Sequence, residues 1–171
     1  MSYFNNFSTI LYDPTGDGSA KLCTNILSRV RVRANMKKEI VMLDSYDVKE
    51  NETPEIVADK HHGSVYYHWV VMLLNNISDI NHDWVKSTRQ MQKYLLSKYT
   101  ETQLTEAHHY EISQTSGDTT VKIEVENATY PTATAITNYE YEIALNETKR
   151  SIDLLRNDYL GFFTEEFSDL I

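Results

Sequence analysis

The stretch Tyr46–Trp84, YDVKENETPEIVADKHHGSVYYHWVVMLLNNISDINHDW, decides the fold of this chain. It opens with a short alternating segment typical of a strand. Thr53–Glu55 then predicts a helix start, because threonine can cap with its hydroxyl, proline fits the first helical turn and glutamate favours the positive end of the helix dipole. Gly63 ends that helix, and Ser64 begins a second one whose apolar residues recur every three or four positions. The stretch therefore predicts a compact strand–helix–helix unit.

The flanking segments predict further elements. Residues 1–18 indicate an extended arm with a turn at Asp13–Gly18. A helix is expected from Ser19 to about Arg31, because its apolar residues have helical spacing: Leu22, Ile26, Leu27 and Val30. Cys23 would be a structural thiol in that apolar stripe. It is the only cysteine, which excludes an intrachain disulfide and fits a reducing compartment.

The rest of the chain predicts alternating strands and helices. Residues 40–48 form a strand, Ser87 opens a third helix, and the segments 109–113 and 119–125 form a hairpin linked by 116–118. After Pro131 the pattern is ambiguous: a capping box at Thr137 and Glu140 favours a helix, although alternate residues are apolar as in a strand, namely Tyr139, Tyr141, Ile143 and Leu145. A strand over 151–155 precedes a last helix capped by Asn157, with one side formed by Tyr159, Phe163, Phe167 and Leu170.

Composition suits one small domain with arms. The chain has 171 residues, and 41% of them are hydrophobic, enough for a modest core. Its 12 tyrosines fit either surfaces that a partner buries or a half-buried core. The longest apolar run, Trp69–Leu74, is too short to span a bilayer, and no signal peptide is recognisable. We expect a soluble protein that is not secreted through a cleaved signal.

Charge is distributed unevenly along the chain. Residues 1–40 carry six basic and three acidic side chains, whereas residues 101–171 carry four basic and fourteen acidic ones. The basic residues Arg29, Arg31, Arg33, Lys37 and Lys38 are not interleaved with aromatic residues and match no nucleic-acid motif. We interpret them as a site that contacts an acidic neighbour or as a solvated face, and we expect no nucleic-acid or membrane binding.

No catalytic or metal-binding motif is recognisable. The sequence has no Gly-x-Ser-x-Gly motif, no phosphate loop and no Cys–His pair, and its acidic residues are scattered singly. The histidines lack the spacing of a metal site: His61, His62, His68, His82, His108 and His109. We interpret them as surface or interface residues, and predict no enzyme, no cofactor and no metal.

Several short motifs resemble a known family. They are Tyr46-x-Val48, Thr53-Pro54-Glu55-x-Val57-Ala58, Gly63, Trp69-Val70, Asn75-Asn76-Ile77 and Asp83-Trp84. Together they resemble the LysM-containing baseplate wedge protein of T-even-type contractile-tailed phages, as do the arm 4–13, the segment 137–152 and the last helix. Two departures are His62-Gly63, where that family commonly has Tyr-Gly, and Trp84-Val85, where it has Trp-Pro.

The resemblance implies an α+β fold with a LysM-like core, an extended N-terminal arm, a β-hairpin and a C-terminal helix. We expect four segments: an arm and helix (1–39), the LysM-like core (40–99), a β-hairpin segment (100–131) and a C-terminal docking segment (132–171). The expected core anchors are Tyr46, Val48, Ile56, Ala58, Trp69 and Leu74.

The implied function is a structural virion protein of the tail baseplate, assembled in the host cytoplasm. It would dock on the wedge core, contact the inner baseplate protein that initiates the sheath, and help join neighbouring wedges into a ring. The alternative is a LysM-type module that binds peptidoglycan glycans, which rests on fold analogy alone.

Aromatic and basic residues of the arms are the expected partner contacts, because a small domain cannot bury so many of them alone. The predicted interface residues are Tyr3, Phe4, Tyr12, Arg29, Arg31, Arg33, Trp84, Phe162, Phe163 and Phe167. Trp69, in contrast, is expected to serve the core.

Overall fold

The computed structural model describes residues 3–28, 40–114 and 121–171. The chain forms two compact units, one of Met1–Trp84 with Ser151–Ile171 and one of Val85–Arg150. Helices and small antiparallel sheets make up both, which confirms the α+β class. This division differs from the four expected segments, because the last part of the chain returns to the first unit.

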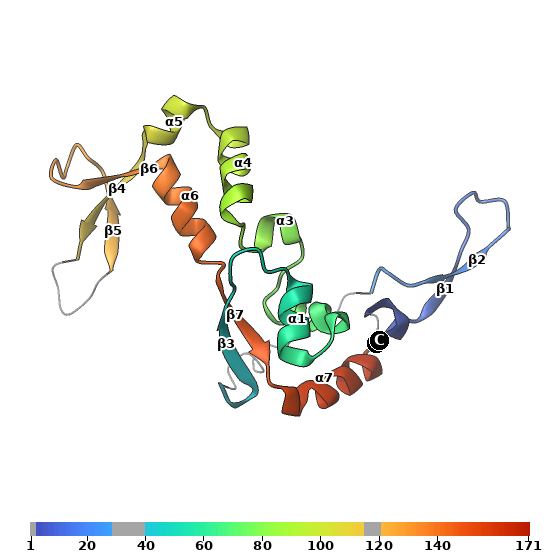
Figure 1. Ribbon diagram of the computed structural model, residues 1–171. Coiled ribbons are helices and arrows are strands. Elements are labelled where there is room, and N and C mark those ends of the chain that lie inside the picture. The colour runs from blue at the N-terminus through green and yellow to red at the C-terminus, as the bar shows by residue number, and fades with distance from the viewer. Residues whose placement is uncertain (1–2, 29–39, 115–120) are drawn as a thin grey trace. The chain divides into compact units, whose positions relative to one another are not determined.

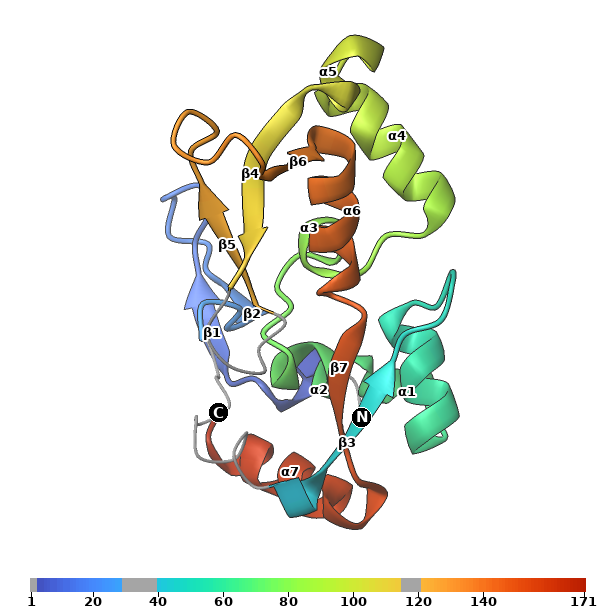
Figure 2. The same cartoon turned by 90° about the vertical axis from the view of Figure 1, so that its left-hand side faces the viewer.

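The first unit contains the predicted strand–helix–helix order. The chain runs through β3 (Leu43–Asp47), α1 (Pro54–His62), the 3-10 turn η4 (Val65–Tyr67) and α2 (His68–Leu74). The strand β7 (Ser151–Leu155) pairs antiparallel with β3, with Tyr46 opposite Ile152 (Figures 1 and 2). The first strand is shorter than expected, because Ile40–Met42 form a 3-10 turn, η3.

The helix boundaries follow local chemistry. Pro54 opens α1, and Gly63 ends it in the left-handed region (φ 71°) with its N–H donating to Asp59 O. Thr53 is extended and makes no side-chain cap hydrogen bond, so the expected capping role of its hydroxyl is wrong. The Ser64 hydroxyl accepts a hydrogen bond from Tyr66 N–H, as expected of a cap.

Apolar residues of α1, α2 and β7 form the centre of the first unit. The fully buried ones include Val57, Val70, Val71, Leu154 and Leu155. Among the expected anchors, the buried ones are Val48, Ala58, Trp69 and Leu74, while Tyr46 is half-buried. Ile56 is 41% exposed, so its expected core role is wrong. The neighbouring Val57 occupies the inward position of that helical turn.

The N-terminal arm is a hairpin. The short 3-10 turn η1 (Tyr3–Asn6) precedes β1 (Thr9–Tyr12), which pairs antiparallel with β2 (Lys21–Thr24). The expected helix from Ser19 to Arg31 is therefore wrong over its first part, and residues 29–31 lie outside the described residues. Cys23 is exposed on β2 and is not buried in an apolar helix stripe.

A carboxylate-centred turn explains why this segment forms strands. The Asp13 carboxylate accepts hydrogen bonds from the N–H groups of Thr15, Gly16 and Gly18. Both glycines have φ values above 70°, which glycine adopts without steric cost. The turn brings β1 against β2, and this pairing overrides the helical spacing of the apolar residues.

The second unit is a three-stranded sheet with helices. Its elements are α4 (Thr88–Lys98), α5 (Glu101–Thr105), β4 (Ala107–Ser113), β5 (Lys122–Val125), β6 (Thr134–Thr137) and α6 (Asn138–Glu147). The strand order is β5-β4-β6, all antiparallel (Figure 2). The two predicted hairpin strands are confirmed, while the predicted link 116–118 lies outside the described residues. Strand β6 was not expected.

Capping boxes begin three helices of this unit. In each box the hydroxyl of the cap residue accepts a hydrogen bond from the backbone N–H three residues later. The Gln or Glu side chain at that later position accepts a hydrogen bond from the backbone N–H of the cap residue. The cap residues are Ser87, Thr100 and Thr137. At Thr137 this confirms the helix that the capping box favoured over a strand.

Two buried polar side chains hold α6 in the second unit. The Glu142 carboxylate accepts hydrogen bonds from Lys98 and Tyr99, and the Asn146 amide pairs with both the N–H and the C=O of Lys86. Burial alone would raise the pKa of Glu142, but the hydrogen bonds from Lys98 and Tyr99 lower it below its ordinary value. The ion pair with Glu142 correspondingly raises the pKa of Lys98.

Two further helices complete the first unit. The short α3 (Ile80–Asp83) is capped by Asp79, and α7 (Asn157–Asp169) follows β7 (Figure 1). The cap position of α7 is Arg156, one residue before the expected Asn157. Leu170 lies at the end of α7 and is exposed, so it does not share the buried side of that helix. No helix within the described ranges is long and apolar enough to cross a membrane.

Candidate interaction surfaces

An aromatic cluster attaches both chain ends to α2. Trp69 contacts Phe167, with ring centroids 4.5 Å apart, and lies 5.6 Å from Tyr3 and 6.1 Å from Phe163. Phe7, which lies in the N-terminal arm, also packs against Phe167. Phe163 and Phe167 are thus buried by the chain itself, and the premise that a partner is needed to bury them is wrong. The reason is that α2 supplies an aromatic partner for α7.

Trp84 is also buried by the chain itself. Its side chain is 5% exposed, and its indole N–H donates to the carbonyl of Glu52 at 2.8 Å. The Glu52 carboxylate accepts hydrogen bonds from Tyr46, Lys49 N–H and Lys60. Burial would raise the pKa of Glu52, but these hydrogen bonds lower it. Trp84 therefore closes the loop between β3 and α1, and its predicted partner role loses its physical basis.

The hairpin of β1 and β2 and the turn just after it carry the most exposed aliphatic side chains among the described residues of the first unit. Leu11 and Leu22 lie directly opposite each other in the register, so both side chains emerge on one face, at 73% and 69% exposure. Ile26 and Leu27 follow just after β2 and are also exposed. The predicted contact Tyr12 is exposed on β1. Tyr12 follows Leu11 in the strand, so its side chain lies on the other face of the hairpin. We call the exposed aliphatic set the hairpin surface: Leu11, Leu22, Ile26 and Leu27.

The outward side of α7 is a second exposed surface. Phe162 is 78% exposed, although its neighbour Phe163 is buried. Asp158, Glu165, Glu166 and Asp169 share its side of the helix at helical spacing and are exposed. We call these five residues the α7 outer face.

The other predicted contacts have different positions. Phe4 is exposed and lies 5.7 Å from the buried Phe7, between ring centroids, while Tyr3 is partly buried in the aromatic cluster. The basic residues Arg29, Arg31 and Arg33 lie outside the described residues. Among the described residues, the structure therefore brings Tyr3, Phe163 and Phe167 together in the aromatic cluster, whereas the other predicted contacts lie outside its buried core.

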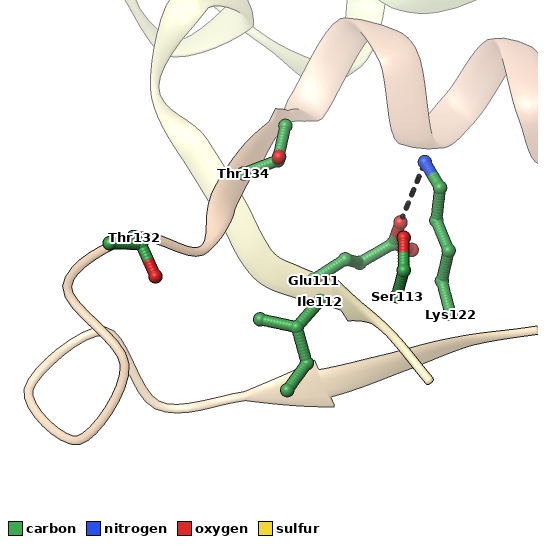
Figure 3. Close-up of a pocket in the computed structure, with 6 residues that line it drawn as sticks. All are labelled: Glu111, Ile112, Ser113, Lys122, Thr132 and Thr134. Carbon is green, nitrogen blue, oxygen red and sulfur yellow. Dashed lines mark ion pairs between the residues drawn. The ribbon is translucent and has the colours of Figure 1, made fainter. Parts of the chain in front are cut away.

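The second unit has a small polar hollow on its sheet, with a volume of about 270 Å³ (Figure 3). It is lined by Glu111, Ile112, Ser113, Lys122, Thr132 and Thr134. Glu111 pairs with Lys122 at 3.4 Å and lies 3.0 Å from His109 Nε2. The His109 hydrogen bond, with help from Lys122, lowers the pKa of Glu111. An ionised carboxylate of this kind is unsuited to general acid catalysis at neutral pH.

The histidines have structural contacts. His61 Nε2 lies 3.0 Å from Leu155 O, and His62 Nδ1 lies 2.9 Å from the Asn157 side-chain oxygen, which joins the end of α1 to the start of α7. In the second unit, His108 stacks on Tyr141 with ring centroids 3.8 Å apart. Within residues 3–28, 40–114 and 121–171, no three His, Cys, Asp or Glu side chains are grouped as metal ligands.

Sequence reasoning missed the hairpin surface, because it assigned the apolar residues after Ser19 to the buried side of a helix. The available signal was the Asp13–Gly18 turn, which has short segments of high strand propensity on both sides, TILY and KLCT. Asn75 was also missed: its amide pairs with both backbone groups of Asp153 and so binds the outer edge of β7. Nothing in the sequence indicates that contact.

Comparison with known protein families identifies the class of protein. The sequence matches the family described as Base plate wedge protein 53 over residues 22–131, more than half of the chain. The chain belongs to this family of phage baseplate wedge proteins. No curated protein matches it. The chain is thus a structural protein of the phage virion, located in the tail baseplate. The T-even type and the LysM-like motif stay predictions.

Proposed function

We propose that this chain docks on the wedge core through its hairpin surface and so helps join neighbouring wedges into the baseplate ring. The expected partners are wedge core subunits, the inner baseplate protein that initiates the sheath, and a neighbouring wedge. Membership of the wedge family supports an assembly role, and such a role requires no catalysis.

The exposure of Leu11 and Leu22 is the observation that carries the proposal. A two-stranded hairpin is only marginally stable in water without further packing. Exposed contiguous apolar surface on a soluble protein commonly marks an interaction site. A partner that covers this face would both bury the leucines and stabilise the hairpin, so assembly and ordering of the arm would be coupled.

The backbone of β1 supports the same proposal. Asn25 N–H donates to Ser8 O at 2.8 Å, and bonded pairs alternate along an antiparallel ladder. The N–H and C=O groups of Thr9 and Leu11 therefore point away from β2, toward the outer edge of the hairpin. A strand of the partner can pair with this edge while its apolar side chains cover the leucines.

The test is incorporation into tails. The double variant Leu11→Ser/Leu22→Ser is compared with Leu96→Ser, which makes the same change at an exposed position of α4 in the second unit. Phage lacking the wild-type chain are complemented with each variant, and mass spectrometry of purified tails measures the amount of the chain. We expect the hairpin variant to be absent from tails and Leu96→Ser to be present at the wild-type, ring-like stoichiometry. Normal incorporation of the hairpin variant would refute the proposal.

The glycan alternative is tested separately. Purified chain is mixed with peptidoglycan and sedimented. Retention that is lost on substitution of the loop after Val48 would favour a LysM-type binding module. Within that loop, the Glu52 carboxylate already accepts hydrogen bonds from Tyr46, Lys49 N–H and Lys60.

A further inference from the structure

We propose that the α7 outer face is a second docking surface, and that its partner is a baseplate protein with an apolar pocket rimmed by lysine and arginine side chains. The inference rests on the proposed assembly role, but it concerns a different surface and a defined partner chemistry. Its basis is an exposed aromatic side chain beside three carboxylates, those of Glu165, Glu166 and Asp169, that pair with no basic side chain of the described residues.

The two sides of α7 differ in burial. Phe163 and Phe167 pack into the aromatic cluster, so the helix is held in place by its inner side. Phe162 extends from the opposite side and is 78% exposed. A large aromatic ring on a fixed helix provides much contact area at little entropic cost, and phenylalanine is enriched at protein interfaces.

Negative charge surrounds Phe162. Glu165 and Glu166 follow it by three and four positions, and Asp169 lies one turn further on the same side. In the described part of the chain, none of these three carboxylates lies within ion-pair distance of a basic side chain. Asp158 differs, because it pairs with Arg156 at 3.3 Å.

This arrangement disfavours the isolated helix. Glu165 and Asp169 are like charges four residues apart, a spacing at which they repel each other. They also lie in the C-terminal half of α7, where the helix dipole favours cations, and the last turn contains no basic residue. A cationic partner surface would remove both penalties, which is the electrostatic complementarity that we expect at the interface.

The same chemistry excludes other partner classes. Nucleic acid and the headgroups of anionic lipids would be repelled by four carboxylates. A purely apolar partner would have to desolvate those carboxylates without compensation. A protein pocket that receives the Phe162 ring, with basic side chains around its edge, satisfies both parts of the surface.

The experiment uses the full chain and unjoined baseplate wedges purified from cells infected with phage that lack it. Binding of the purified chain to these wedges is measured by co-sedimentation at about 50 mM and about 500 mM NaCl. The variants are Phe162→Ser and the triple variant Glu165→Gln/Glu166→Gln/Asp169→Asn. The matched controls are Tyr139→Ser and Glu101→Gln/Glu124→Gln/Glu126→Gln, which make comparable changes at exposed positions of the second unit.

We expect Phe162→Ser to weaken binding about 30-fold at both salt concentrations, as for an aromatic hot spot. The triple variant should weaken binding about 10-fold at low salt and little at high salt, because salt screens exposed charges. Both controls should bind like the wild type. Unchanged melting curves by circular dichroism will show that the variants are folded.

Several outcomes would overturn the inference. Wild-type binding by Phe162→Ser, or tighter binding by the triple variant, would show that the α7 outer face is not an interface with a basic partner. Concentration-dependent self-association that Phe162→Ser abolishes would assign the face to a second copy. Only this inference fails if the wild-type chain and Phe162→Ser both bind the wedges while Leu11→Ser/Leu22→Ser does not. If the wild-type chain does not bind, the proposed function fails as well.

Discussion

Two positions on different sides of α7 provide a sharp test of which aromatic side chains hold the first unit together. Phe167→Ala removes a ring that is 2% exposed and that lies against Trp69, with centroids 4.5 Å apart. Phe162→Ala removes the same ring from the same helix where it is 78% exposed. Both variants gain the same helix propensity, about 0.5 kcal/mol in favour of alanine. The difference between their free energies of unfolding therefore measures the effect of burial alone.

Deleting a buried phenylalanine ring costs about 3–5 kcal/mol, from lost transfer free energy and the cavity left behind. We expect Phe167→Ala to lower the free energy of unfolding by that amount. This is a large fraction of the roughly 5–15 kcal/mol that stabilises a typical domain. Phe162→Ala should remain within about 0.5 kcal/mol of the wild type, as surface substitutions usually do.

The assay is equilibrium unfolding in urea, followed by tryptophan fluorescence, because Trp69 lies inside the aromatic cluster. Comparable m-values are required, so that a shift in midpoint reports stability and not a change in the surface exposed on unfolding. Equal stability of the two variants would refute the assignment of Phe167 to the core. A larger loss in Phe162→Ala would show that the two sides of α7 are reversed.

Three further predictions concern polar contacts. The pKa of Glu142 is below its ordinary 4.5, so its ion pair with Lys98 stabilises the fold above pH 4.5, and this stabilisation is lost as pH falls below that value. Glu142→Gln should lower the free energy of unfolding by about 1–3 kcal/mol near neutral pH. It should also remove the acid dependence of stability measured by urea unfolding. Trp84→Phe should cost about 1 kcal/mol by removing the hydrogen bond to Glu52 O, and a neutral result in thermal unfolding would contradict the assignment. Burial lowers the pKa of His62 below 6.5, so the unfolded chain gains a proton before the folded one does. Stability should therefore decrease as pH falls below 6.5. An NMR titration that places the His62 pKa above 6.5 would disprove this prediction.

Local signals in the sequence predicted much of the secondary structure. Pro54 and Gly63 delimit α1, and the capping box at Thr137 begins α6, because these residues act on the backbone of their own turn. The failures involve contacts between segments distant along the chain. The helical spacing after Ser19 is real, but the pairing of β2 with β1 outweighs it.

The candidate interaction surfaces were predictable only in part. Phe4, Tyr12 and Phe162 were expected to be partner contacts and are exposed, whereas Trp84 and Phe167 were expected in the same role and are buried. All five are aromatic residues, and composition cannot distinguish them. What separates them is whether another element supplies a packing partner, as α2 does for α7.

By itself, the sequence determined the class of fold, both ends of α1, the starts of α4 and α6, and the family of wedge proteins, because capping chemistry and motifs are local. Only the tertiary structure decided that β7 completes the sheet begun by β3 more than a hundred residues earlier, and that Phe162 is exposed while Phe163 is buried. The physical reason is that burial depends on which distant segments meet. Surfaces available to a partner are those that remain after the chain has packed against itself.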